Sequence, residues 1–186
     1  MSRPKKEISV NVKECIENAF WSQMEKGTYK DITIKSLAIE AGVNRNTVYY
    51  YYDSVADVAR KTCERYADGE ATLQIMRSIL KGDRRELLNN PQTMSNWRKA
   101  RLFAKDDSPY IKTMFQTKLR NNWCLAMGIE YDTQPEYKKM ELDFIFAGLV
   151  ELIGSDMVSE NPSKLLEFLE GDLGKGIIKT MNSVTC

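Results

Sequence analysis

The stretch from Thr33 to Tyr52 restricts the fold more than any other part of this 186-residue sequence. Its pattern is that of a short helix beginning at Thr33, a turn at Gly42, and a second short helix after Asn44. Thr and Asn are preferred at helix N-termini, and glycine commonly follows the last residue of a helix. Alanines in the first helix would let the second helix approach closely. The segment therefore predicts a helix-turn-helix.

The rest of the chain favours helices as well. Glycine and proline interrupt it at few places, and the period-two alternation typical of strands is almost absent. Helical spacing of apolar residues predicts helices over 11–26, 33–41, 45–51, 55–68, 70–81, 92–105, 108–127, 135–159 and 162–181. We therefore expect an all-α protein with an N-terminal three-helix domain, residues 1–54, and a C-terminal helical domain, residues 55–186. The helix at 55–68 would belong to both halves.

Composition excludes several classes of function. The chain has no histidine, which removes histidine-based nucleophile schemes, imidazole acid–base catalysis and His-based zinc sites. Its four cysteines are widely scattered and form no CxxC pair, so we expect reduced thiols and no metal site. No paired-carboxylate motif or glycine-rich phosphate loop is present. We expect a protein that is not an enzyme and needs no cofactor.

Charge and hydropathy are those of an ordinary cytoplasmic protein. No apolar run reaches the roughly 18 residues that a membrane span needs, and no signal-peptide pattern follows the basic N-terminus. Residues 1–52 hold eight basic and six acidic side chains, a net charge of +2, while the whole chain carries +1. This weak asymmetry does not by itself indicate nucleic acid.

The outer face of the second short helix does indicate DNA. Its exposed positions are nearly all hydrogen-bonding side chains: Asn44, Arg45, Asn46, Thr47, Tyr49 and Tyr50. A short helix with such a face suits insertion into the major groove by its N-terminal end.

This segment resembles the signature of the tetracycline-repressor (TetR) family of transcriptional regulators. The matching residues are Thr33, Leu37-Ala38, Ala41-Gly42-Val43, the polar Asn44 to Thr47, Val48, Tyr49 to Tyr52 and Ser54, with Ala19-Phe20 and Lys26-Gly27-Thr28-Tyr29 in the first helix. The match covers about residues 10–60. Beyond it, the chain resembles the family only in length and helical character.

The resemblance implies roles for individual residues. Thr33 would bind a phosphate at a helix N-terminus, and Tyr49 and Tyr50 would grip phosphates. Arg45, Asn44 and Thr47 would contact base edges. Tyr52 stands at the position of a buried aromatic residue in the family, so the resemblance implies that it is part of the core. The expected neutralisers of backbone charge are Lys35, Arg3, Lys5 and Lys6.

Two positions differ from the family pattern. The family commonly has glycine where this chain has Asn46, and Asn46 would instead donate a hydrogen bond to the phosphate backbone of the DNA. The family also commonly has a lysine where this chain has Val55, and losing that cation should lower the salt dependence of DNA binding by about one unit.

The C-terminal half would supply the dimer interface and an effector site. By resemblance, the helices at 135–159 and 162–181 pack against a twofold mate to set two recognition helices one DNA turn apart, on a palindromic operator. The apolar residues expected there are Leu142, Ile145, Phe146, Leu149, Val150, Leu152, Ile153, Leu165, Leu166, Phe168, Leu169, Leu173, Ile177 and Ile178, with intramolecular core as the alternative.

Aromatic and methionine residues in the middle of the chain predict an apolar pocket for a small-molecule effector, with plain core as the alternative. They are Trp97, Leu102, Phe103, Tyr110, Met114, Phe115, Trp123, Met127, Tyr131 and Phe144. Together these patterns predict a homodimeric DNA-binding regulator, a repressor released by its effector. The competing hypothesis is a helical protein–protein adaptor with a degenerate helix-turn-helix.

Overall fold

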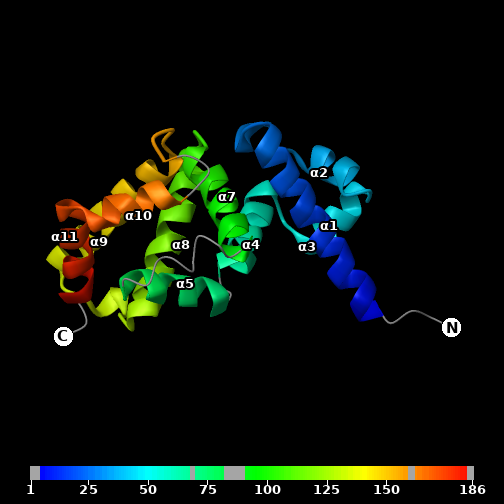
Figure 1. Ribbon diagram of the computed structural model, residues 1–186. Coiled ribbons are helices and arrows are strands. Elements are labelled where there is room, and N and C mark those ends of the chain that lie inside the picture. The colour runs from blue at the N-terminus through cyan, green and yellow to red at the C-terminus, as the bar shows by residue number, and fades with distance from the viewer. Residues whose placement is uncertain (1–4, 68–69, 82–90, 159–161, 184–186) are drawn as a thin grey trace. The chain divides into compact units, whose positions relative to one another are not determined.

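The computed structural model describes residues 5–67, 70–81, 91–158 and 162–183, and these ranges are helical, as the sequence predicts (Figure 1). The chain divides into two compact units, residues 1–63 and 64–186. The first unit therefore runs past Ser54 into the helix that the sequence assigns to both halves. None of the described helices is both long and apolar enough to cross a membrane.

The first unit is built from four α-helices around one small core. They are α1 (Lys5–Lys26), α2 (Ile34–Glu40), α3 (Arg45–Tyr51) and the first part of α4 (Val55–Ala67), with a 3₁₀ turn η1 at Tyr29–Asp31. The core side chains include Ile16, Phe20, Leu37, Val48 and Val58, all fully buried. Each helix contributes apolar residues at helical spacing, so the core fixes α2 and α3 against α1 and α4.

The turn between α2 and α3 depends on a glycine. Gly42 has a φ of +66°, a left-handed conformation that side chains with a Cβ rarely adopt. The Val43 amide donates to the Ala38 carbonyl at 3.0 Å, and the Gly42 amide donates to the Ile39 carbonyl at 3.2 Å. This pair of bonds is a Schellman motif, which satisfies carbonyls that the end of a helix leaves unpaired. It sets the sharp change of direction that a helix-turn-helix needs.

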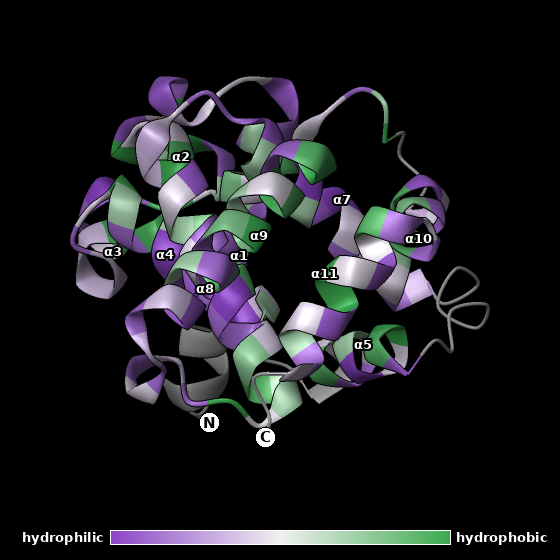
Figure 2. Cartoon of the chain, turned by 90° about the vertical axis from the view of Figure 1, so that its left-hand side faces the viewer, coloured by the Kyte–Doolittle hydropathy of each residue, from purple (hydrophilic) through white to green (hydrophobic). Residues whose placement is uncertain are grey.

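The second unit packs its helices around a larger core. After the end of α4 come α5 (Glu70–Leu80), α7 (Pro91–Lys105), α8 (Pro109–Met127), η2 (Tyr131–Thr133), α9 (Glu136–Gly154), α10 (Ser163–Glu170) and α11 (Asp172–Asn182). Helix α9 packs on α7 and α8, α5 packs on α8, and α10 packs on α11. Figure 2 shows hydrophilic and hydrophobic residues interspersed along α5 and α10, as expected of helices with one buried face.

Two predicted helices differ from those in the structure. The helix predicted at 135–159 ends at Gly154, where a Cβ would lie 2.5 Å from the Ala104 carbonyl oxygen of α7. The segment predicted as one helix at 162–181 is two helices, because Gly171 is extended and serves as C-cap of α10 and N-cap of α11. Apolar spacing continues across Gly171, so periodicity alone did not show the break.

Candidate functional site

Helix α3 exposes the polar face that the sequence predicts. Val48 is fully buried, and around it the side chains of Arg45 and Asn46 are exposed. Tyr49 and Tyr50 are 56% and 80% exposed, which is unusual for aromatic side chains in a folded unit. A rigid helix anchored by one buried valine therefore presents an arginine, an amide and two phenols outward.

Two of the residues predicted to contact bases, Asn44 and Thr47, also bond to each other. The Asn44 Oδ1 accepts from the Thr47 amide at 2.8 Å and from the Thr47 hydroxyl at 3.0 Å. Asn44 is thus the N-cap of α3. This leaves Arg45 and Asn46 as the N-terminal side chains of α3 that are exposed and make no such cap.

Thr33 is likewise engaged within its own helix. Its hydroxyl accepts from the Ser36 amide at 3.0 Å, and its amide donates to the Ser36 hydroxyl at 3.0 Å. The pair forms a capping box at the start of α2. The two Thr33 groups predicted to hold a phosphate would have to exchange these bonds for it.

The last tyrosine of the run, Tyr52, is the C-cap of α3 and is buried in the core of the first unit. It is 2% exposed, and its hydroxyl donates to the Glu17 carboxylate of α1 at 2.9 Å. The Lys61 ammonium of α4 lies 5.2 Å from the centre of its ring. The prediction that Tyr52 belongs to the core is confirmed. Tyr51, half-buried, lies edge-to-face with Tyr50 at 4.9 Å.

A polar clamp fixes α2 to α1. The Glu40 carboxylate of α2 accepts from the Lys26 ammonium at 2.8 Å and from the Ser22 hydroxyl at 2.5 Å. The hydrogen bond from Lys26, followed by that from Ser22, lowers the pKa of Glu40 from 4.5 to about 2. The clamp neutralises Lys26, so this lysine contributes less positive charge to the surface than its exposure suggests.

The described cations near α3 include Lys13, whose ammonium lies 5.5 Å from the centre of the Tyr51 ring, and Lys61, which donates to the Tyr51 carbonyl at 3.1 Å. Lys35 and Arg45 are both exposed. Val55, at the position where the family commonly has a lysine, is half-buried as the first residue of α4. The side chains of Arg3, Lys5 and Lys6 lie outside the described part of the chain. Within that part, no group of three or more cysteine or carboxylate residues is placed to hold a metal ion.

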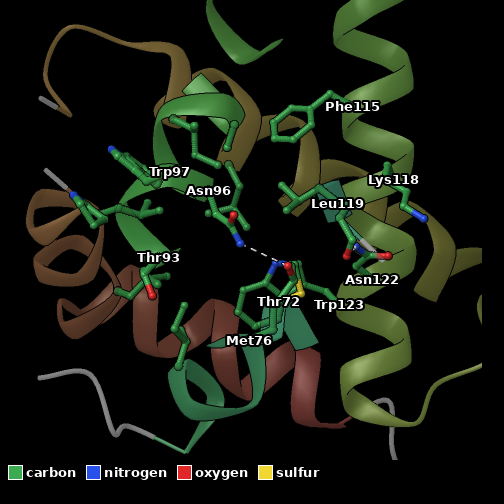
Figure 3. A pocket seen from close by; sticks show the side chains of 18 of the residues that line it. Thr72, Met76, Thr93, Asn96, Trp97, Phe115, Lys118, Leu119, Asn122 and Trp123 are labelled. Carbon is green, nitrogen blue, oxygen red and sulfur yellow. Dashed lines mark hydrogen bonds between the residues drawn. The ribbon is translucent and has the colours of Figure 1, made fainter. Parts of the chain in front are cut away.

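The second unit contains a cavity of about 160 Å³. Its walls come from the end of α4 and from α5, α7, α8, α9, α10 and α11, and Figure 3 shows the side chains around it. Apolar residues predominate, and the aromatic residues of the wall are Tyr66, Trp97, Phe115 and Trp123. This is the concave apolar environment that binds small molecules in many proteins.

The cavity includes three of the ten residues predicted for an effector pocket: Trp97, Phe115 and Trp123. The other seven lie elsewhere. Phe103 is fully buried beside Phe115, with ring centres 5.8 Å apart, while Phe144 is 82% and Tyr110 is 43% exposed. Met127 and Tyr131 pack against the core around Leu142. Leu102 and Met114 are half-buried and also do not line the cavity.

Sequence reasoning missed the polar residues of the cavity wall. Thr93, Asn96 and Asn122 are each more than nine-tenths buried and line it. Thr93 and Asn96 stand three residues apart on the same face of α7 as Trp97, a spacing that periodicity could have shown. The sequence prediction of the pocket rested on aromatic and methionine residues and therefore did not include them.

Helix α9 carries an exposed apolar stripe on the side opposite its core residues. Tyr137, Met140 and Phe144 are 61%, 66% and 82% exposed, and Gly148 continues the stripe one turn further. Most of the α9 residues predicted for the dimer interface, such as Leu142 and Phe146, are instead buried within the chain. The stripe is the exposed apolar surface of α9.

No family model and no curated protein matches the sequence. Among solved structures, the chain is similar to a TetR family repressor, AlkX from Dietzia sp. strain DQ12-45-1b, implicated in biodegradation of n-alkanes. The two are 13% identical, the alignment covers 94% of this chain and 97% of that one, and the TM-score is 0.44. This is the family that residues 10–60 resemble.

Proposed function

We propose that this protein is a TetR-like transcriptional regulator that binds a palindromic operator as a homodimer. The observation that carries the proposal is the outer face of α3, where Arg45, Asn46, Tyr49 and Tyr50 are all exposed around the buried Val48. Arginine and asparagine are the side chains that best distinguish guanine and adenine in the major groove. Exposed tyrosine hydroxyls suit phosphate oxygens on either side.

The exposed stripe on α9 supports the homodimer. Three large apolar side chains in one line, ending at a glycine, make a surface that a second copy of the same helix could cover. Twofold pairing would present two copies of α3 to one face of the duplex, about 34–36 Å apart. A cytoplasmic regulator of this kind would find its operator as a preformed dimer.

The cavity supports a regulator that a small molecule controls. Tyr66 and Ala67, the last residues of α4, line it, and the same helix begins at Val55 directly after α3. A ligand that moves the end of α4 could therefore change the spacing of the recognition helices. We infer that the protein represses transcription and that effector binding releases it from DNA.

The direct test is an electrophoretic mobility shift with duplexes selected from a random pool. Salt-sensitive, sequence-specific binding that Arg45→Ala weakens about 5- to 150-fold supports the regulator. An absence of enrichment at low salt, with the protein folded, would favour the helical adaptor with a degenerate helix-turn-helix.

The dimer is tested separately by sedimentation. Phe144→Ser should shift the chain toward monomer, because it removes the most exposed side chain of the stripe. Leu125→Ser is the comparison, since Leu125 is also a large apolar side chain, 60% exposed, on a different helix, α8. Equal effects of the two substitutions, or none, would contradict this interface.

A further inference from the structure

The carbonyl at the end of α3 receives a hydrogen bond from a lysine of α4. The Lys61 ammonium donates to the Tyr51 carbonyl oxygen at 3.1 Å. Tyr51 is the last residue of α3, and the final carbonyls of a helix have no amide partner within it. These carbonyls also form the negative end of the helix dipole, so an ammonium bound to one of them stabilises the last turn.

A carboxylate of α4 keeps the ammonium in this place. The Asp57 Oδ2 accepts from the Lys61 ammonium at 2.7 Å and from the Asp53 amide at 3.2 Å. Asp53 lies in the short connection between α3 and α4. The other carboxylate oxygen, Oδ1, accepts from the Arg60 guanidinium at 2.6 Å. The carboxylate therefore binds both the cation at the end of α3 and the chain that leaves α3.

The same ammonium also lies over a ring of the core. It is 5.2 Å from the centre of the Tyr52 ring, and Tyr52 is buried with its hydroxyl bonded to Glu17 of α1. Lys61 thus contacts a carbonyl, a carboxylate and an aromatic face of the first unit, although its side chain is 41% exposed. Its charge is used within the protein.

Helix α3 depends on contacts of this kind because it is short. It has seven residues, and Val48 is the buried one. A helix of this length is not stable alone, and one buried side chain leaves its two ends to be fixed by other groups. Asn44 caps the first turn, and Lys61 binds the last carbonyl.

We propose that Lys61 is a positioning residue for DNA binding. Its ammonium, oriented by Asp57, fixes the C-terminal end of α3 on α4 and so sets the direction in which α3 presents its outer face to DNA. The role in DNA binding rests on the proposed function, whereas the contact with α3 does not. The competing role for this cation is a direct bond to a DNA phosphate.

The contact with α3 is tested in the full-length protein without DNA, by hydrogen exchange measured with NMR. Lys61→Met removes the ammonium and keeps an unbranched apolar side chain, and the amides of residues 50–52 should then exchange about 5-fold faster. Arg60→Met is the matched control, because it removes the neighbouring cation that binds the same carboxylate. If these amides exchange no faster in Lys61→Met than in Arg60→Met, the proposal is overturned.

The role in DNA binding is tested with a duplex selected in the mobility-shift assay. Lys61→Met should weaken binding about 3- to 10-fold, with the salt dependence unchanged because no phosphate contact is lost. A salt dependence lower by about one unit would show that Lys61 binds a phosphate and would contradict the positioning role.

The conservative variant separates positioning from mere loss of a lysine. Lys61→Arg should bind the duplex within about 2-fold of the original protein, because a guanidinium can donate to both the carbonyl and the carboxylate. Equal weakening by Lys61→Arg and Lys61→Met would contradict the proposal.

The two assays also distinguish failure of this inference from failure of the proposed function. Faster exchange in Lys61→Met, in a protein that binds no duplex, would support the contact with α3 and contradict the regulator. Unchanged exchange in a protein that binds its duplex would support the regulator and overturn the positioning role.

Discussion

The four consecutive tyrosines from Tyr49 to Tyr52 have different uses although they are chemically identical. Tyr49 and Tyr50 are exposed on α3, whereas Tyr52 is buried and bonded to Glu17 of α1. The helix places successive side chains about 100° apart, so one run of sequence supplies both the outer surface and the core.

Substituting phenylalanine for these tyrosines should separate stability from DNA binding. Tyr52→Phe removes the hydrogen bond to the half-buried Glu17 carboxylate and should cost about 1 kcal/mol of unfolding free energy, measured with urea. Tyr50→Phe should change stability by less than about 0.5 kcal/mol and weaken operator binding about tenfold, through loss of a phosphate contact. A large stability loss at Tyr50 would show that its hydroxyl is structural.

The clamp at Glu40 should make stability depend on pH. A carboxylate whose folded-state pKa is lowered from 4.5 to about 2 stabilises the fold fully above pH 4.5. That contribution is lost as the pH falls through about 2. Glu40→Gln should therefore lower the melting temperature by about 1–3 °C at pH 6, with the difference from the original protein shrinking toward pH 2.

Glu25→Gln, at an exposed position of α1, is the control for this pH dependence. If its difference from the original protein shrinks toward acid pH in the same way, the effect does not belong to the clamp.

At the scale of elements, the turn between α2 and α3 depends on Gly42. Gly42→Ala places a Cβ in a left-handed conformation and should cost about 1–2 kcal/mol, measured by thermal or urea unfolding. No clash contributes, since nothing in the described structure lies within 4 Å of that Cβ. A neutral result would mean that the turn can relax to another conformation.

Substituting alanine for Gly148 on α9 should have opposite effects in a monomer and in a closely packed dimer, so the direction of the effect distinguishes the two. In a monomer with a solvated stripe, Gly148→Ala should stabilise the helix by up to about 1 kcal/mol, because alanine has the higher helix propensity and no described atom lies within 4 Å. In a closely packed dimer the added methyl separates the helices and weakens association about tenfold. We expect weaker association by sedimentation, and stronger or unchanged association would contradict a close contact at this glycine.

Local patterns predicted most helices because caps and apolar spacing are local properties. The end of α9 was not predictable in this way. The Arg101 guanidinium of α7 donates to the carbonyls of Ile153, Ser155 and Val158, which takes up main-chain acceptors at and beyond the end of the helix. Nothing in the sequence of residues 150–160 indicates that Arg101, about 50 residues earlier in the chain, bonds to these carbonyls.

The exposed face of α3 was predictable for the same reason, whereas the cavity was not. Asn44 and Thr47 are polar in sequence whether they face DNA or cap a helix, and only the geometry distinguishes these uses. The cavity wall gathers Thr93, Asn122 and Trp123 from different helices, so its composition follows from packing rather than from any one segment.

At the scale of the whole molecule, the proposed homodimeric regulator requires two copies of α3 to bind one duplex together. The measurement that tests this most directly is selection of duplexes from a random pool, followed by sedimentation of the enriched complex. We predict an inverted repeat with half-sites one helical turn apart, two chains for each duplex, and loss of base preference within each half-site in Arg45→Ala. Enrichment of no sequence, or of a single site bound by one chain, would contradict it.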